Sequence, residues 1–262
     1  APSNDTLFGA LNVGYAVNAL FPARLGEIIR AYWVRDRSGT GMVRTLSTIA
    51  LERTLDGLTL LLFLLIAVPT VAIPRTLLGP ALTIGAVFIA ALLAMAVIAY
   101  TLSRENHPLA GLLRALEAGR WSFIPNAVGQ IVAGLTSLRN RRTLVLVGVY
   151  TLVIWLANAA MVWLALRAFH LAIPFTGALL LTAVLNLGMA VPSSPGYVGV
   201  FEYLMVLTLG LYGIGHTPAL AAALVFHAIS FVPVTLIGLF YIARLGLGTT
   251  VQLVRAGVMR GG

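Results

Sequence analysis

The sequence contains no cysteine and no lysine, and charged residues make up only 10% of its 262 positions. The absence of cysteine excludes disulfides, thiolate metal sites and cysteine nucleophiles. The absence of lysine excludes Schiff-base chemistry and the lysine of a phosphate-binding P-loop. Soluble domains carry about 25% charged residues. The charged residues are therefore too few for a chain of this size that folds in water.

Hydrophobic residues dominate instead, at 60% of the chain, and the mean hydropathy is +0.97. A helix of about 20 apolar residues crosses the roughly 30 Å core of a bilayer. The sequence therefore predicts an all-α, polytopic integral membrane protein built as a helical bundle. Five long stretches contain no Asp, Glu or Arg: 57–74, 76–103, 143–166, 168–201 and 203–243.

The basic residues indicate the orientation of the chain. All seventeen are arginine, with six in 24–53 and six in 104–142. A nucleic-acid-binding protein is excluded because these arginines lie between apolar stretches rather than in one polar domain. Cytoplasmic loops carry the basic excess in membrane proteins. We therefore expect a multi-pass protein of the cytoplasmic (inner) membrane, with both segments and the C-terminus on the cytoplasmic side.

We expect the whole chain, 1–262, to form a single transmembrane domain. In 107–140 the apolar residues recur at helical spacing, which predicts two amphipathic helices at the membrane interface or a solvated helical hairpin packed on the protein. The remaining expected segments are a first motif at 7–56, spans near 57–73, 80–102, 143–166 and 218–243, and a broken pair of helices at 171–213.

The broken pair is interrupted by Pro-Ser-Ser-Pro-Gly at 192–196. Proline removes a backbone donor and clashes with the preceding helical turn, so no continuous helix accepts this segment. Two topologies remain open: two short spans that meet at a cytoplasmic turn, or a re-entrant hairpin whose tip lies in the membrane. Irregular backbone at membrane depth must be buried in protein or line a wet cavity. We predict the re-entrant hairpin.

The first of three polar clusters follows a short apolar stretch and comprises Asn18, Arg24, Glu27 and Arg30. The last three residues share one face of a helix, where Glu27 can pair with either arginine. The remaining positive charge suits a phosphate, which arginine binds through two parallel hydrogen bonds. The alternative is an ordinary basic segment beside the membrane.

The second cluster is Glu52, Arg53 and Asp56, at the mouth of the span that starts near residue 57. A carboxylate at the centre of a bilayer costs about 2.5–3.5 kcal/mol on insertion scales. These groups must therefore face a partner or a water-filled cavity. The alternative is a salt bridge between helices that only fixes their packing.

The third cluster surrounds the break and comprises Asn186, Ser193, Ser194, Gly196 and Glu202. A helix that starts after the break presents free N–H groups, which bind anions in the broken helices of transporters. We expect Glu202 to meet an arginine or to take a proton. The alternative is a kink with a neutral glutamic acid.

The first and third clusters are alike, since each follows an apolar stretch with an asparagine, a proline, a glycine and a glutamate. Paired interruptions of this kind are typical of inverted-repeat transporters, although chance similarity is the alternative. We further predict that Glu52, Asp56 and Glu202 converge with at least one of Arg24, Arg30 or Arg53 around a common polar cavity, because none can face lipid alone.

Three ordered motifs, residues 21–30 (FPARLGEIIR), 52–56 (ERTLD) and 192–202 (PSSPGYVGVFE), resemble the flippase-like family, which includes the membrane region of lysylphosphatidylglycerol synthases. The resemblance implies a polytopic membrane protein that moves or handles lipids or lipid-linked precursors. Members have one or two spans before the first motif, so it also implies a truncated N-terminus. The aminoacyl-transferase domain of the synthases is absent from this sequence. His227 lies where the family carries a basic residue.

The resulting hypothesis is a lipid translocator, not an enzyme, in which arginine binds the phosphate of a phospholipid or polyprenyl-phosphate-type lipid. We expect no catalytic residue, cofactor or metal, and a homo-oligomer is retained as an option. Two alternatives stay open: a membrane transferase or phosphatase acting on a lipid phosphate, and an accessory subunit that docks a partner through 107–140. The proposed binding residues are Asn18, Arg24, Glu27, Arg30, Glu52, Arg53, Asp56, Asn186, Ser193, Ser194, Gly196 and Glu202.

Overall fold

The computed structural model describes residues 2–21, 25–71, 140–190 and 193–244, together with scattered positions between 83 and 133. Every regular element in these parts of the chain is a helix, which confirms the all-helical prediction. The expected span near 80–102 and the expected interfacial helices at 107–140 fall largely outside the described residues, and Arg24 falls outside them entirely.

The N-terminal half begins with three helices. Helix α1 (Asn4–Leu20) starts at Ser3, whose hydroxyl accepts a hydrogen bond from the Thr6 backbone. It stops at Phe21, which is extended because the next residue in the sequence is a proline. Helices α2 (Gly26–Ser38) and α3 (Met42–Ala67) follow, and α3 continues into the short 3-10 helix η1 (Val68–Thr70). The polar residues 44–56 and the apolar residues after them therefore share one helix.

The second half contains α7 (Arg141–Ala168), α8 (Phe175–Gly188), the 3-10 turn η3 (Pro195–Tyr197), α9 (Val200–Gly210) and α10 (His216–Arg244). The break between α8 and α9 contains two glycines with positive φ, Gly196 at 64° and Gly199 at 86°. The backbone of residues other than glycine rarely adopts this conformation. The chain therefore bends sharply at this point before α9 begins.

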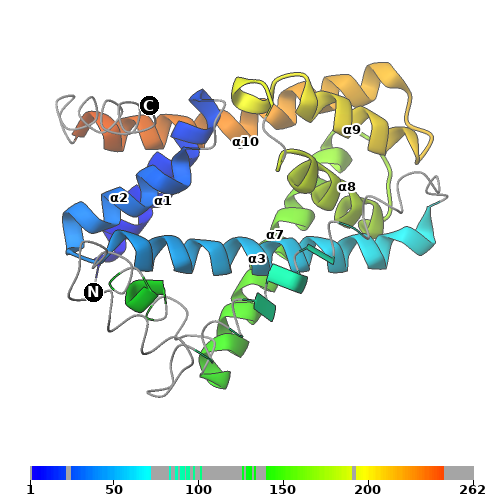
Figure 1. Ribbon diagram of the computed structural model, residues 1–262. Coiled ribbons are helices and arrows are strands. Elements are labelled where there is room, and N and C mark those ends of the chain that lie inside the picture. The colour runs from blue at the N-terminus through cyan, green and yellow to red at the C-terminus, as the bar shows by residue number, and fades with distance from the viewer. Residues whose placement is uncertain are drawn as a thin grey trace.

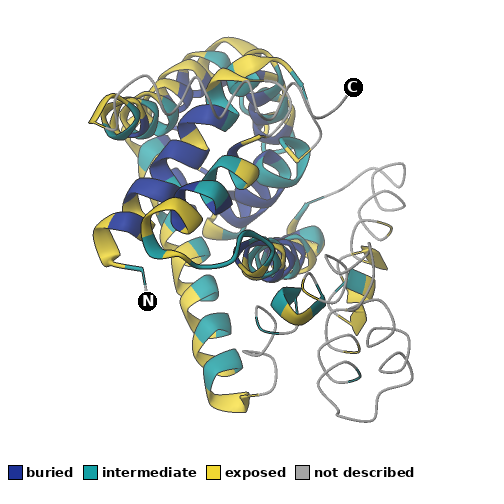
Figure 2. Ribbon diagram, turned by 60° about the vertical axis from the view of Figure 1, so that its left-hand side comes forward, coloured by how far each residue is buried: buried dark blue, intermediate teal, exposed yellow. Residues whose placement is uncertain are grey.

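Helices α7 and α10 are the two described helices that are long and apolar enough to cross a membrane. Both carry large exposed apolar side chains: Tyr150 and Ile154 on α7 are 65% and 64% exposed, and Ile229 and Phe240 on α10 are 62% and 61% exposed. Figure 2 colours the ribbon by how far each residue is buried. An apolar face of this size needs an apolar environment. The described helices thus form the kind of bundle that resides in a membrane.

The helices pack as two similar triplets (Figure 1). In α1–α2–α3 and in α8–α9–α10, an apolar helix ends at a break, a short helix follows, and a long helix completes the unit. The first helix of each triplet packs against the third helix of the other, α1 on α10 and α8 on α3. Helix α7 packs on α3 and α8. The inverted repeat and the re-entrant hairpin stay predictions.

Helices α1 and α10 approach most closely at Gly238. A Cβ atom at this glycine would clash with the Asn12 carbonyl oxygen and lie 2.5 Å from the Cβ of Ala16. Small residues of this kind let membrane helices bring their backbones together. The contact between the two triplets therefore depends on glycine at position 238, which has no Cβ atom.

We expect Gly238→Ala to destabilise the protein by about 1–3 kcal/mol, because the added methyl group forces α1 and α10 apart. Thermal unfolding of the purified protein in detergent measures the loss. Gly148→Ala on α7 is the control, since nothing lies within 4 Å of its added methyl group. Equal stability of the two variants would contradict the close approach.

Candidate functional site

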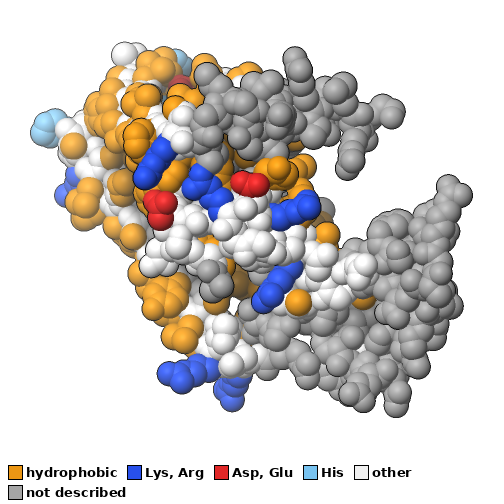
Figure 3. All heavy atoms as spheres, turned by 90° about the vertical axis from the view of Figure 1, so that its left-hand side faces the viewer, with side chains coloured by type: hydrophobic (Ala, Val, Ile, Leu, Met, Phe, Trp, Pro, Cys, Tyr) orange, Lys and Arg blue, Asp and Glu red, His pale blue; other side chains and the backbone are white. Residues whose placement is uncertain are grey.

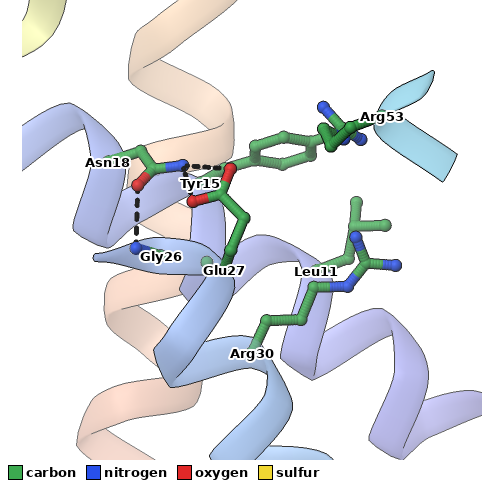
Figure 4. A pocket seen from close by; sticks show the side chains of 8 residues that line it. Leu11, Tyr15, Asn18, Gly26, Glu27, Arg30 and Arg53 are labelled. Atoms are coloured by element: carbon green, nitrogen blue, oxygen red, sulfur yellow. Dashed lines mark hydrogen bonds between the residues drawn. The ribbon is translucent and has the colours of Figure 1, made fainter. Parts of the chain in front are cut away.

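A polar pocket lies between α1, α2 and α3, with an empty volume of about 260 Å³ that includes its open mouth. Figure 4 shows its side chains, and Figure 3 shows basic and acidic side chains gathered among hydrophobic ones on the face that includes α1 and α2. The pocket combines residues of the first two clusters identified in the sequence. It is lined by Leu11, Gly14, Tyr15, Asn18, Gly26, Glu27, Arg30 and Arg53.

Asn18 ties the end of α1 to the start of α2. Its Oδ1 accepts a 2.8 Å hydrogen bond from the Gly26 N–H, and its Nδ2 donates to both carboxylate oxygens of Glu27 at 3.4 Å. Gly26 permits this approach, since a Cβ there would clash with the Gly14 carbonyl oxygen. The asparagine thus binds a free N–H of the first turn of α2 and holds Glu27 at the edge of the pocket.

The charged centre of the site is a network between α2 and α3. The Arg30 guanidinium donates to both oxygens of Glu52, from Nη1 at 3.0 Å and from Nη2 at 2.8 Å. The Nη2 atom of Arg53 lies 2.5 Å from Glu52 Oε1 and 3.1 Å from Asp56 Oδ2. Parallel hydrogen bonds of this kind are among the strongest that charged side chains make. Arg30, Glu52, Arg53 and Asp56 are hereafter called the arginine–carboxylate network.

Helix α7 joins this network through Trp155, whose indole N–H donates a 2.8 Å hydrogen bond to Asp56 Oδ1. The two oxygens of Asp56 therefore have different partners, Arg53 and Trp155. The sequence indicated that arginines of the first cluster could pair with the carboxylates of the second, and the structure shows this for Arg30. It gave no signal for Trp155, which lies 99 positions from Asp56.

One hydrogen-bond donor of Arg53, its Nε–H, is unused among the described residues. Its Nε is buried and has no hydrogen-bond partner among the described residues. A buried donor without a partner costs about 1–3 kcal/mol. Arg53 is also one of the residues that line the pocket.

The third cluster forms a separate polar unit in which Glu202 binds His227, not an arginine. Glu202 Oε1 lies 2.5 Å from His227 Nδ1, and Oε2 accepts a 2.6 Å hydrogen bond from the Gly199 N–H. The other ring nitrogen, Nε2, lies 2.8 Å from the carbonyl oxygen of Gly196. The imidazole therefore joins α10 to the turn η3 and to the first turn of α9. Convergence of Glu202 with the arginines stays a prediction.

The other predicted residues of this cluster have local roles in the structure. The Ser194 hydroxyl donates to the Val198 carbonyl at 2.6 Å, and the Asn186 amide donates to the Thr182 carbonyl within α8 at 2.9 Å. The Ser193 hydroxyl is buried without a hydrogen-bond partner among the described residues. None of these contacts reaches the arginine–carboxylate network.

The break nevertheless touches the first half of the chain. The turn η3 packs on α1, and a Cβ at Gly196 would lie 3.6 Å from the Ala19 carbonyl oxygen. Ala19 follows Asn18, which lines the pocket. The last turn of α1 therefore connects the two polar units. In the described part of the chain, no group of three or more His, Asp or Glu side chains could hold a metal ion.

Residues 3–238 match the family described as the lysylphosphatidylglycerol synthase transmembrane region. The chain belongs to this family. It is 28% identical to glycosyltransferase AglD of Haloferax volcanii over 88% of the chain, but it spans only 42% of that relative's length. It is 22% identical to a UPF0104 membrane protein of Methanocaldococcus jannaschii, over 87% of the chain and 94% of the relative. No solved structure matches the chain.

The family confirms the resemblance that the three motifs indicated and makes the chain a multi-pass membrane protein. Its match covers α1 and most of α10, and thus both polar units.

The network gives a direct stability test. We expect Glu52→Gln to lower the free energy of unfolding by about 2 kcal/mol, because it removes the carboxylate that Arg30 and Arg53 share. Thermal unfolding in detergent measures the loss. Asp36→Asn, on the exposed side of α2, removes the same charge and should change stability by less than about 0.5 kcal/mol. If both variants unfold alike, the network does not hold α2 on α3.

Proposed function

We propose that the protein translocates phosphate-bearing lipids across the membrane and that the pocket between α1, α2 and α3 binds the phosphate. The observation that carries this proposal is that Arg30 and Arg53 both line one pocket, and that the buried Nε of Arg53 has no partner among the described residues. Membership in a family of membrane proteins named after a phospholipid synthase supports a lipid substrate.

Guanidinium chemistry supports a phosphate ligand. Each arginine has five N–H donors in a planar fork that matches two phosphate oxygens. Glu52 accepts one hydrogen bond from each Nη of Arg30, and Arg53 meets Glu52 and Asp56 through Nη2 alone. Both side chains therefore retain donors for a further oxyanion. Arg24 precedes the pocket in the sequence and stays a predicted participant.

The charge balance of the network favours reversible binding. Arg30 and Arg53 together carry two positive charges, and Glu52 and Asp56 carry two negative charges when ionised, so the four side chains are neutral overall. A phosphate must then compete with carboxylates for the guanidinium groups instead of filling an uncompensated positive site. A translocator needs such an exchange, because it must release its substrate on the other side of the membrane.

The helix packing supports a mechanism of alternating access. We infer that α1–α2–α3 and α8–α9–α10 are inverted repeats, since each triplet packs its first helix on the third helix of the other. Transporters of this design bind substrate near breaks in their helices and rock one repeat against the other. The pocket lies beside one such break, between α1 and α2.

The side of binding and the lipid class follow from general rules. The arginine-rich segment at 24–53 places the pocket on the cytoplasmic side by the positive-inside rule. Phospholipids and polyprenyl phosphates both carry the phosphate that the arginines recognise. The similarity to a glycosyltransferase over part of its length makes a lipid-linked sugar precursor a reasonable member of this class.

Arg53→Lys tests the proposal, because lysine keeps the charge but has no Nε–H fork. We expect about a tenfold or greater loss in the rate of phospholipid translocation, the effect of one charge-assisted hydrogen bond. The assay follows a fluorescent phospholipid across vesicles that contain equal amounts of each variant, with thermal stability measured alongside. Arg35→Lys, on the exposed side of α2, is the control and should transport normally.

Each alternative gives a different result. Full transport by Arg53→Lys would mean that Arg53 only forms a structural salt bridge. Chemical change of the lipid would favour an enzyme. No lipid movement by the wild-type protein, with phospholipid or with polyprenyl phosphate, would refute the proposed function.

A further inference from the structure

We propose that Glu202 and His227 form an exchangeable proton site that couples lipid movement to a proton gradient. This inference rests on the proposed function, and it adds the coupling ion and the side chains that carry it. Its basis is the hydrogen-bond geometry of the pair, together with the contact that the break makes with α1.

The geometry fixes the number of protons on the imidazole–carboxyl pair. A carbonyl oxygen only accepts hydrogen bonds, so His227 Nε2 must carry a hydrogen that it donates to Gly196 at 2.8 Å. The 2.5 Å contact between Nδ1 and Glu202 Oε1 needs a second proton between the two atoms. That proton belongs either to an imidazolium beside a carboxylate or to a carboxylic acid beside a neutral imidazole. In both cases the pair holds one proton that can leave.

The pair is enclosed by aromatic rings. His227 and Glu202 are each only 8% exposed. The imidazole stacks on Phe201 at 4.4 Å between ring centroids and meets the edge of Phe231 at 4.5 Å. Ion pairs are screened little in such surroundings, so loss of the proton has a large local effect.

No other described carboxylate contacts the imidazole. On α1, Asp5 accepts a hydrogen bond from the Tyr241 hydroxyl at 2.7 Å, and Tyr15 lines the arginine pocket. On α9, Tyr203 is exposed, and α8 carries no titratable side chain. On η3, Tyr197 packs its ring on Phe231. The other charged or titratable groups of α10 itself are His216 at its start and Tyr241 and Arg244 in its last turn.

Removal of the shared proton would weaken the attachment of the break to α10. The Glu202 carboxylate would then face the lone pair of Nδ1, so that an acceptor meets an acceptor at a distance where a hydrogen bond had been. The segment held by this contact contains the two positive-φ glycines, Gly196 and Gly199. These positions are suited to a change in backbone direction.

A movement of the break would reach the lipid pocket through α1. Gly196 lies against the Ala19 carbonyl, and the neighbouring Asn18 binds Gly26 and Glu27. Proton loss and phosphate binding thus act on neighbouring residues of the same helical turn. In one cycle, the pair takes one proton from the side with the higher proton concentration and releases it to the other side. No covalent bond other than that to the proton is made or broken.

The test compares lipid movement in vesicles with and without an imposed pH gradient. If one proton moves per lipid, a gradient of one pH unit should shift the steady-state distribution of a fluorescent phospholipid up to about tenfold. Glu202→Gln should lose the response to the gradient, measured relative to its own lipid movement at equal pH on both sides. Glutamine imitates the neutral carboxylic acid, because its amide can donate to Nδ1 while it has no proton to exchange.

His216→Gln provides the matched control, since it alters a histidine on the same helix that is exposed at the first residue of α10. It should respond to the gradient as the wild type does. A gradient response that persists in Glu202→Gln would overturn the inference and leave the pair with a purely structural role. A wild type that moves lipid but ignores the gradient would also overturn it, while the proposed function would stand.

If the wild type moves no lipid under any condition, the proposed function fails and the proton site is tested alone. Nuclear magnetic resonance of protein labelled with 15N-histidine reports the protonation of each ring nitrogen, and His227→Gln assigns the signal. We expect the Nδ1 signal of His227 to show the proton shared with Glu202 in the wild type and to change in Glu202→Gln. A Nδ1 signal that is the same in both proteins would overturn the proton site.

Discussion

The hydrogen-bonded pair between Arg30 and Glu52 is the contact on which the first half of the structure depends. Helices α2 and α3 bring a guanidinium and a carboxylate into an otherwise apolar bundle, where neither charge is tolerated alone. Two parallel hydrogen bonds satisfy both groups. Arg53 pairs with Asp56, and Asp56 in turn accepts a hydrogen bond from Trp155 on α7. The pocket exists because these side chains must meet each other instead of lipid.

The two triplets use different partners to pair a carboxylate inside the bundle. In the first, a short helix supplies a cation, Arg30, to a carboxylate on the following long helix, Glu52. In the second, the short helix supplies the carboxylate, Glu202, to a titratable base on the long helix, His227. Arginine keeps its charge at all relevant pH values, whereas histidine does not. The two triplets, which share one order of helices, thus contain an arginine–carboxylate pair in one half and a histidine–carboxylate pair in the other.

Composition was enough to predict the helical membrane class, and the resemblance of three ordered motifs indicated the family. Composition and spacing also singled out the polar clusters. They predicted the contact of Arg30 with the second cluster because a carboxylate near hydrocarbon needs a partner and few cations were within reach. They did not predict Trp155 as a partner of Asp56, since a single aromatic residue in an apolar helix carries no signal of its hydrogen bond. Glu202 was expected to meet an arginine or take a proton. Its partner, His227, was visible only through the family resemblance, because the contact joins residues 25 positions apart across a turn.

The hydrogen bond from Trp155 to Asp56 places a fluorescent side chain beside the candidate pocket. Indole fluorescence responds to the charge and hydrogen bonding around its N–H group. Trp155 is bound to the same carboxylate that Arg53 touches, so any ligand that draws Arg53 away alters the surroundings of this ring. The protein contains only four tryptophans. Occupancy of the pocket can therefore be followed by intrinsic emission, without a label on the lipid or on the protein.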